Sequence, residues 1–160
     1  NNLGKIEADR RDIDKLIMNF QEQIRLRPDN YLFQWRLGNL YMSKNDPEEA
    51  LKQYEKALSV KPDYFEALND IADLYSKKGR FNDAVNAYKK AYEQRKDRHD
   101  LIYSIAVTYA KQNDLKQSIA WLQKLVSIGY KNLKRLETDK DLENIRASSE
   151  YKELIKNIKS

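Results

Sequence analysis

The sequence repeats with a period of 34 residues, and this period constrains the fold more than any other feature. Tyr41, Tyr75 and Tyr109 are separated by that step, and so are Leu37, Ile71 and Ile105. Periods of about 20 to 50 residues are typical of repeat proteins, in which one unit cannot bury its apolar face alone and stacks on its neighbours. We therefore expect a chain of similar units rather than a single globular core.

One position of the repeat always holds a very small residue. It is Gly4, Gly38, Ala72 and Ala106 in successive units. A glycine inside a helix costs roughly 1 kcal/mol relative to alanine, so its presence requires a reason. Small residues allow two helix backbones to approach closely, while large residues fill the space opposite. We predict that a second helix packs against Gly38.

Each unit has the pattern of a helix, a tight turn and a second helix. Asn45, Gly79 and Asn113 stand where the first helix should end, and these residue types tolerate the left-handed conformation of a helix C-cap. Apolar residues at helical spacing resume after each of them. They form small and bulky columns: Ala50, Ala84 and Ser118; Tyr54, Tyr88 and Leu122; Ala57, Ala91 and Leu125. With only three prolines and four glycines, the chain is expected to be all-α with short connections.

These columns resemble the tetratricopeptide repeat family, and the unit that shows it best carries Leu37, Gly38, Tyr41, Ala50, Tyr54, Ala57 and Pro62. The resemblance implies a right-handed superhelical solenoid of antiparallel helix pairs. It covers full units at residues 31–64, 65–98 and 99–132 within a single domain, 1–160. Two positions depart from the family pattern, since Gln34 replaces its tryptophan and Glu7 its tyrosine.

The two ends of the chain depart from the repeat. Residues 1–30 make an incomplete unit, whose first helix we expect to be displaced or truncated. Residues 133–160 leave the register and are expected to form capping helices, the last of them capped by Ser148 or Ser149. Terminal units of such arrays need an altered outer face for solubility.

The resemblance implies a concave groove, lined by the first helix of each unit, that binds a protein or peptide. The positions that face this groove in the family correspond here to Trp35, Arg36, Asn39, Met42, Glu66, Asn69, Asp70, Asp73, Asp100, Tyr103, Ser104 and Val107. Asn2, Lys5 and Asp9 would be added by the incomplete unit. Clamps for acidic chaperone tails carry lysine and arginine at such positions, so the aspartates here argue against that ligand.

The expected groove combines aromatic and acidic side chains. Trp35, Met42 and Tyr103 are large side chains of the type that dominates interface energetics. Four carboxylates lie among them, at Glu66, Asp70, Asp73 and Asp100. We therefore hypothesise a ligand with basic and apolar residues. The alternative is that Trp35 and Tyr103 are buried against neighbouring helices.

Two other functions are compatible with this pattern. An incomplete first unit could expose an apolar helix face and allow the chain to self-assemble. The chain could also be a regulatory domain excised from a larger protein, since it begins at Asn1 without methionine. Cytoplasm is the default location, with an exported or periplasmic bacterial protein as the alternative.

The composition gives little support for other classes of function. His99 is the only histidine and stands at an expected helix start, cysteine is absent, and no glycine-rich phosphate loop occurs. Aspartates 139 and 141 are better explained by the start of a helix than by a metal site. The net charge of +5 is dispersed, with 30 basic and 25 acidic residues interleaved. We thus expect no enzyme, cofactor, metal, nucleic-acid partner or membrane span.

Overall fold

The computed structural model describes residues 2–159, and the side chains of residues 11–158. Asn2, Lys5 and Asp9 thus lie outside the side chains that can be described. The described residues are helical, without a strand, which confirms the all-α prediction. The elements are α1 (Asn2–Leu26), α2 (Tyr31–Ser43), α3 (Pro47–Val60), α4 (Phe65–Lys77), α5 (Phe81–Gln94), α6 (His99–Lys111), α7 (Leu115–Ser127), α8 (Leu133–Thr138), the 3-10 helix η1 (Lys140–Ile145) and α9 (Ser149–Lys159).

The chain divides into two compact units, Asn1–Leu74 and Tyr75–Ser160. We call them unit 1 and unit 2. Unit 1 contains α1, α2, α3 and most of α4, and unit 2 contains the end of α4 and all later elements. Each unit is described separately below.

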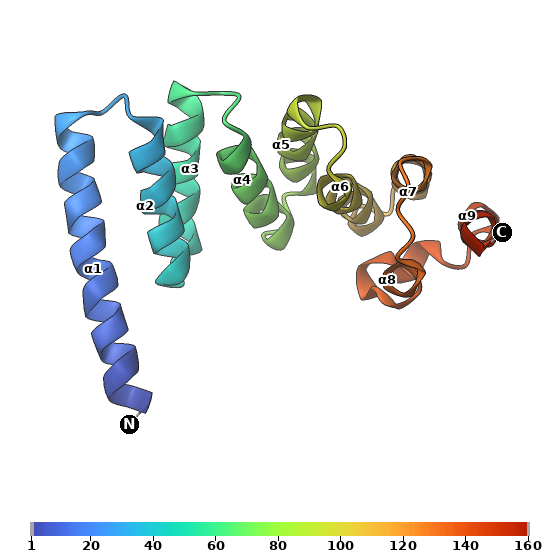
Figure 1. Ribbon diagram of the computed structural model, residues 1–160, viewed down its shortest axis with the longest axis horizontal. Coiled ribbons are helices and arrows are strands. Elements are labelled where there is room, and N and C mark those ends of the chain that lie inside the picture. The colour runs from blue at the N-terminus through green and yellow to red at the C-terminus, as the bar shows by residue number, and fades with distance from the viewer. Residues whose placement is uncertain (1, 160) are drawn as a thin grey trace. The chain divides into compact units, whose positions relative to one another are not determined.

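In unit 1, α2 and α3 form an antiparallel pair (Figure 1). They pack tightly at Gly38, where a Cβ atom would lie 2.5 Å from Cε1 and 2.7 Å from Cδ1 of the Tyr54 ring. The Tyr54 ring is buried, and so are Ala50 and Ala57 on the same helix. The prediction that a second helix packs against Gly38 is confirmed, and that helix is α3.

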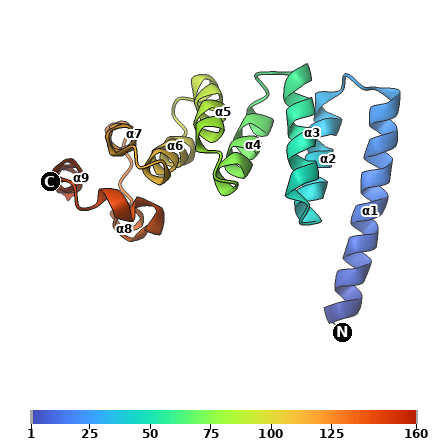
Figure 2. The same ribbon diagram turned by 180° about the vertical axis from the view of Figure 1, so that it is seen from behind.

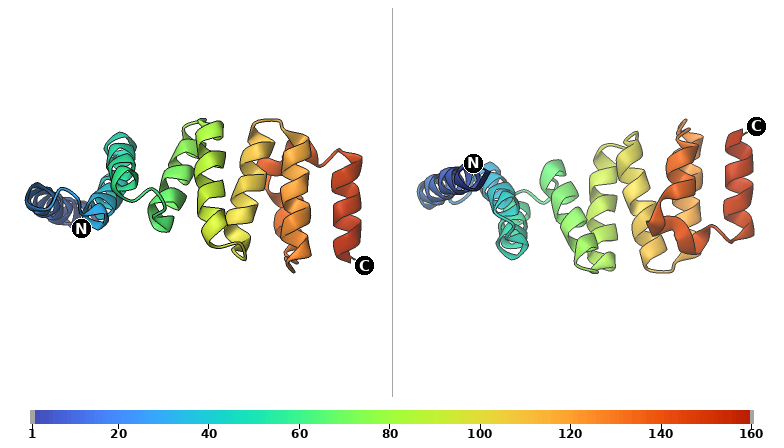
Figure 3. Two further views of the ribbon diagram at one scale, coloured as in Figure 1. Left: turned by 90° about the horizontal axis from the view of Figure 1, so that it is seen from above. Right: turned by 90° about the horizontal axis from the view of Figure 1, so that it is seen from below.

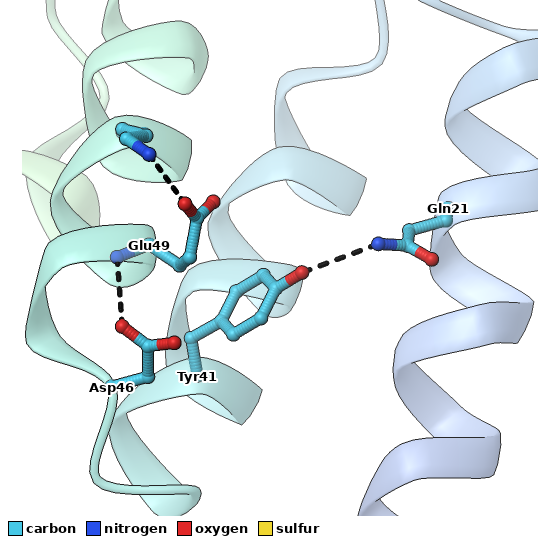
Figure 4. A network of polar contacts seen from close by, with 5 residues as sticks. Gln21, Tyr41, Asp46 and Glu49 are labelled. Atoms are coloured by element: carbon cyan, nitrogen blue, oxygen red, sulfur yellow. Dashed lines mark hydrogen bonds and ion pairs between the residues drawn. The ribbon is translucent and has the colours of Figure 1, made fainter.

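The first helix differs from the expectation. Residues 2–26 form one continuous helix instead of a displaced or truncated first helix followed by a second one. Its side of the contact with α2 includes Phe20, whose ring packs edge-on against Phe33, and Gln21, whose Nε2 donates to the Tyr41 hydroxyl at 3.2 Å (Figure 4). Lys44 adds an ion pair with Asp14 at 2.8 Å. The residues of α1 have no glycine or proline between Gly4 and Pro28, so nothing in the sequence interrupts the helix.

The repeated turns have the same backbone conformation. Asn45, Gly79 and Asn113 adopt φ angles of 63°, 74° and 59°. The residue after each donates its N–H to the carbonyl of a repeat tyrosine: Asp46 to Tyr41 at 2.8 Å, Arg80 to Tyr75 at 2.9 Å and Asp114 to Tyr109 at 3.0 Å. These are helix C-caps with a left-handed residue, as predicted.

The starts of α3 and α7 are set by side-chain caps. The Asp46 carboxylate accepts the N–H of Glu49 at 3.2 Å, as Figure 4 shows, and Asp114 accepts that of Gln117 at 3.1 Å. Such caps satisfy backbone donors that have no partner inside the helix. Pro47 stands at the first position of α3, where a missing N–H removes no helical bond.

In unit 2, α6 packs between α5 and α7 (Figure 2). Ser118 of α7, which occupies the repeat position of the small residues Ala50 and Ala84, lies at this contact. It is fully buried and donates its hydroxyl to the Ala106 carbonyl at 2.8 Å. Leu122 and Leu125 of α7 are fully buried as well. Unit 2 therefore uses the same close helix packing as unit 1, with other residues in the columns.

The C-terminal segment completes unit 2. Leu136, Leu142 and Ile145 are fully buried, and η1 contacts α6. Ser148 caps the last helix by accepting the Tyr151 N–H at 3.2 Å, and α9 lies beside α7 (Figure 3). The segment forms short helical elements, as the sequence indicates, and these pack on the last helix pair.

Candidate functional site

Trp35 occupies the centre of a polar and aromatic cluster in unit 1. It projects from α2 and is half-buried. Its Nε1 donates to Oδ2 of Asp70 in α4 at 2.7 Å, and its ring meets the Tyr64 ring edge-on with centroids 5.6 Å apart. Trp35 is thus held in one orientation from α4 while part of its ring stays accessible.

A pocket of about 420 Å³ opens beside Trp35. Its lining combines aromatic, aliphatic and polar side chains from α1 and α2: Phe20, Trp35, Arg36, Asn39, Leu40 and Ser43. We call it the Trp35 pocket. Its size is enough for one or two side chains of a partner protein.

The α4 side of this cluster is acidic. Burial raises the pKa of Asp70, and the nearby charges of Asp73 and Glu66 raise it further, while the hydrogen bond from Trp35 opposes the shift. Burial also raises the pKa of Tyr64 to about 12, with Glu66 contributing. Three carboxylates on one face of α4 repel one another, and a cationic ligand would relieve that repulsion.

The other predicted residues of unit 1 have mixed surroundings. Asn39 accepts the Tyr54 hydroxyl at 2.6 Å, so it fixes the α2–α3 contact as well as lining the pocket. Met42 and Asn69 are half-buried, and a hydrogen bond from Asn69 acts on Asp70. Arg36 is exposed at the pocket. The structure therefore brings most of the predicted unit 1 residues together around Trp35.

The predicted residues of unit 2 lie on α6. Asp100 is exposed, and its pKa is lowered by hydrogen bonds from Arg98, the shorter at 2.5 Å. Ser104 and Val107 are half-buried, and the Ser104 carbonyl accepts the Thr108 hydroxyl at 2.7 Å. This part of the predicted surface therefore has no acidic cluster like that of α4.

The expectation that Tyr103 presents a free aromatic ring is corrected by the structure. Only 2% of Tyr103 is exposed. Its hydroxyl donates to Asp139 at 2.6 Å, and the Arg135 guanidinium lies 3.9 Å from its ring centre. The C-terminal segment covers this face of α6. The prediction used the positions of complete repeats, and the contact with this non-repeat segment is not part of that pattern.

Two aromatic side chains of the unit 1 site, Phe20 and Tyr64, were not among the predicted residues. Phe20 falls one period before Tyr54, so the repeat assigns it to the packing column rather than to a pocket. Tyr64 stands in a turn, where the repeat register gives no facing direction. The only indication in the sequence was that both residues are aromatic. Their proximity to Trp35 becomes evident only when the positions of α1 and α4 are known.

Other kinds of site were also sought in residues 2–159. Among the side chains of residues 11–158, no group of three or more His, Cys, Asp or Glu is arranged to hold a metal ion. None of the helices there combines the length and apolar character needed to cross a membrane. His99 is exposed at the start of α6, and Asp139 caps η1 by accepting the Asp141 N–H at 2.9 Å, as the sequence indicated.

Two models of repeat families match the sequence. One, described as TPR repeat, matches residues 38–79, and the other, described as tetratricopeptide repeat, matches residues 77–137. The chain belongs to the tetratricopeptide repeat family. No match was found among curated proteins.

Solved structures of tetratricopeptide repeat proteins share the fold. A crystal structure of MamA is 18% identical, with a TM-score of 0.73 over 98% of this chain and 82% of that one. A tetratricopeptide repeat protein from Parabacteroides merdae is 20% identical, with a TM-score of 0.76 over 94% of this chain and 60% of that one. YrrB, described as having an unusual peptide-binding site, is 14% identical, with a TM-score of 0.74 over 98% and 79% of the two chains.

Membership of this family supports a general role as a protein-interaction module. It does not by itself select a ligand or a binding face. The ligand depends on surface residues that are not needed for packing, and these vary between members of a repeat family.

Proposed function

We propose that this tetratricopeptide repeat chain is a non-enzymatic module that binds a peptide segment of a partner protein at the Trp35 pocket. The observation that carries the proposal is the half-exposed Trp35 ring, fixed by Asp70 and Tyr64 at the mouth of a pocket. A rigid aromatic side chain held in place before binding loses little conformational entropy when a partner covers it.

The chemistry of the site favours a ligand that combines an apolar side chain with basic residues. The apolar side chain would contact Phe20, Trp35 and Leu40, and the basic residues would pair with the carboxylates of α4. Charge complementarity of this kind selects partners and speeds their association. The proposal leaves Tyr103 outside the contact surface, because that ring is buried.

Selection from a random peptide library tests this function. The full chain serves as bait, and enriched peptides are measured by fluorescence anisotropy against wild type and a Trp35→Ala variant. We expect enrichment of Lys or Arg beside an aromatic or aliphatic residue. Loss of one interface tryptophan should weaken binding by about 2 kcal/mol, or about thirtyfold.

The chain offers a matched control in its second tryptophan. A Trp121→Ala variant removes the same side chain from unit 2 and should bind the enriched basic peptides as wild type does. Circular dichroism checks that both variants are folded. Equal binding by Trp35→Ala and wild type would place the site elsewhere.

A second candidate function, self-assembly, is favoured by exposed apolar side chains on α1. Leu16, Met18 and Leu26 are 49%, 69% and 60% exposed. Self-assembly predicts that sedimentation velocity of the full chain depends on concentration and that a Met18→Gln, Leu26→Gln variant loses this dependence. A concentration-independent monomer would remove this candidate.

A further inference from the structure

A second cluster of aromatic and charged side chains lies in unit 2, on α5, α6 and α7. Trp121 of α7 is half-buried, and two lysine side chains lie over its ring. Lys124 Nζ is 4.9 Å and Lys89 Nζ 5.9 Å from the ring centre. We call these three residues the Trp121 cluster.

Neighbouring tyrosines hold both ammonium groups in place. Lys124 Nζ lies 4.4 Å from the ring centre of Tyr92, which itself meets Trp121 edge-on at 5.1 Å. Lys89 Nζ donates to the Tyr109 hydroxyl at 2.6 Å and lies 5.2 Å from that ring centre. Aromatic faces attract an ammonium group without neutralising its charge, so two positioned cations remain on this surface.

The charges around the Trp121 cluster are not balanced. Among the residues that the structure describes, neither Lys89 nor Lys124 has a carboxylate within ion-pair distance. The sequence of α7 contains no Asp or Glu. The two carboxylates of α5 are already engaged, Asp83 with Arg80 at 2.7 Å and Glu93 with Lys96 at 3.1 Å.

We propose that the Trp121 cluster binds an acidic segment of a protein partner. Both ammonium groups lie over the Trp121 ring, so a segment that carries several carboxylates can pair with each of them, and among the described residues Lys124 donates no hydrogen bond. Nucleic acid fits less well, because two lysine ammonium groups lie over the Trp121 ring and the Tyr92 ring packs perpendicular to it. Single-stranded nucleic acid needs an open aromatic face on which a base can stack.

This inference is independent of the proposed peptide site. The Trp35 pocket lies in unit 1 beside carboxylates, whereas the Trp121 cluster lies in unit 2 and is positive. The two surfaces select ligands of opposite charge. A negative result for one site would not affect the proposal for the other site.

The test is a nuclear magnetic resonance titration of the 15N-labelled full chain with a hexaglutamate peptide. The chain has two tryptophans and therefore two indole N–H signals, which a Trp121→Phe variant assigns. We expect the Trp121 signal to shift and saturate while the Trp35 signal stays in place. A Trp121 signal that does not move with hexaglutamate would overturn the proposal.

Matched variants separate a defined site from general attraction. Lys89→Gln with Lys124→Gln should weaken hexaglutamate binding by about fivefold or more. Lys90→Gln with Lys116→Gln removes the same charge from exposed positions of α5 and α7 and should have a smaller effect. Equal weakening by both pairs would overturn the proposal. If the first pair does not fold, the single Lys124→Gln variant replaces it, because Lys124 is exposed.

A third arm tests the class of partner. An oligothymidylate of equal charge should bind more weakly than hexaglutamate, because it finds no open ring face. Tighter binding of the oligothymidylate with the same shift of the Trp121 signal would assign the surface to nucleic acid and overturn the proposal.

Discussion

At the scale of single residues, the fold depends on small contacts repeated in each unit. Gly38 is the clearest case, because the Tyr54 ring occupies the space that a Cβ atom would need. The ring cannot easily move away, since it is buried and its hydroxyl is bonded to Asn39. Packing therefore overrides helix propensity at this position.

We predict that Gly38→Ala destabilises the chain. Overpacking costs about 1 to 3 kcal/mol, and the gain in helix propensity returns about 1 kcal/mol, so a net loss of about 1 kcal/mol is expected. Urea denaturation measures it. In a Tyr54→Leu background the added methyl should cost less, since the equivalent positions of the third repeat combine Ala106 with Leu122. The same loss in both backgrounds would contradict the steric explanation.

The left-handed turn residues give a second prediction. Asn45→Gly should leave the free energy of unfolding unchanged or slightly higher, because glycine adopts positive φ without strain. Asn113→Gly should instead lose about 1 kcal/mol, because the Asn113 side chain accepts a hydrogen bond from Asn144 at 2.9 Å. Thermal denaturation of the two variants distinguishes these roles. Equal effects at both positions would show that the Asn144 bond contributes nothing.

Asp70 provides a third prediction, in which stability and binding oppose each other. Burial raises the pKa of Asp70 in the folded chain above its value in the unfolded chain. Folding therefore favours the protonated carboxyl group. This contribution to stability is fully present below the unfolded pKa and is lost as pH rises through the folded pKa. Asp70→Asn should therefore be more stable than wild type at pH 7, by less than about 1 kcal/mol, and the difference should vanish at acidic pH. The variant can still accept the Trp35 N–H but should bind a basic peptide more weakly. A variant less stable than wild type at pH 7 would contradict this reading.

At the scale of helices and turns, the sequence predicted what the repeat itself determines. The turn residues, the small columns and the short capping helices follow from local propensity and spacing, and the structure confirms them at Asn45, Gly38 and Ser148. These features depend on neighbours within one unit. Such features can be predicted without knowing how the ends of the chain pack against the repeats.

The features that the sequence did not predict arise from contacts outside the register. Residues 2–26 form one helix instead of an incomplete pair, because no proline, and no glycine after Gly4, interrupts it. The burial of Tyr103 follows from Asp139 and Arg135, which lie in a segment without repeat spacing. Phe20 enters the Trp35 pocket because α1 packs on α2.

The contact between α6 and the C-terminal segment gives a fourth prediction. Tyr103→Phe removes the hydroxyl that donates to Asp139 and should loosen residues 133–145 without unfolding the chain. Local openings of this kind appear as faster amide hydrogen exchange. Mass spectrometry should show faster exchange in peptides covering α8 and η1, with unit 1 unchanged. Uniform exchange across both units would mean that Tyr103 stabilises the fold globally.

At the scale of the whole molecule, the net charge of +5 conceals two surfaces of opposite character. Unit 1 places three carboxylates near Trp35, and unit 2 places two lysines without carboxylate partners on Trp121. Charge counted over a chain predicts solubility and association rates, whereas ligand choice depends on local arrangement. An interaction module can in this way contact partners of different chemistry.

In the function proposed here, unit 1 binds a basic, apolar peptide at the Trp35 pocket and the carboxylates of α4. The most direct measurement is isothermal titration of the full chain with the peptide enriched by wild type, at low and high salt. The account predicts that affinity falls with salt and falls by about fivefold or more in a Glu66→Gln, Asp73→Asn variant. A control with Asp29→Asn and Asp63→Asn, two exposed turn residues of the same unit, should bind as wild type. An affinity that does not depend on salt, or that both pairs of substitutions reduce equally, would contradict the proposed binding site.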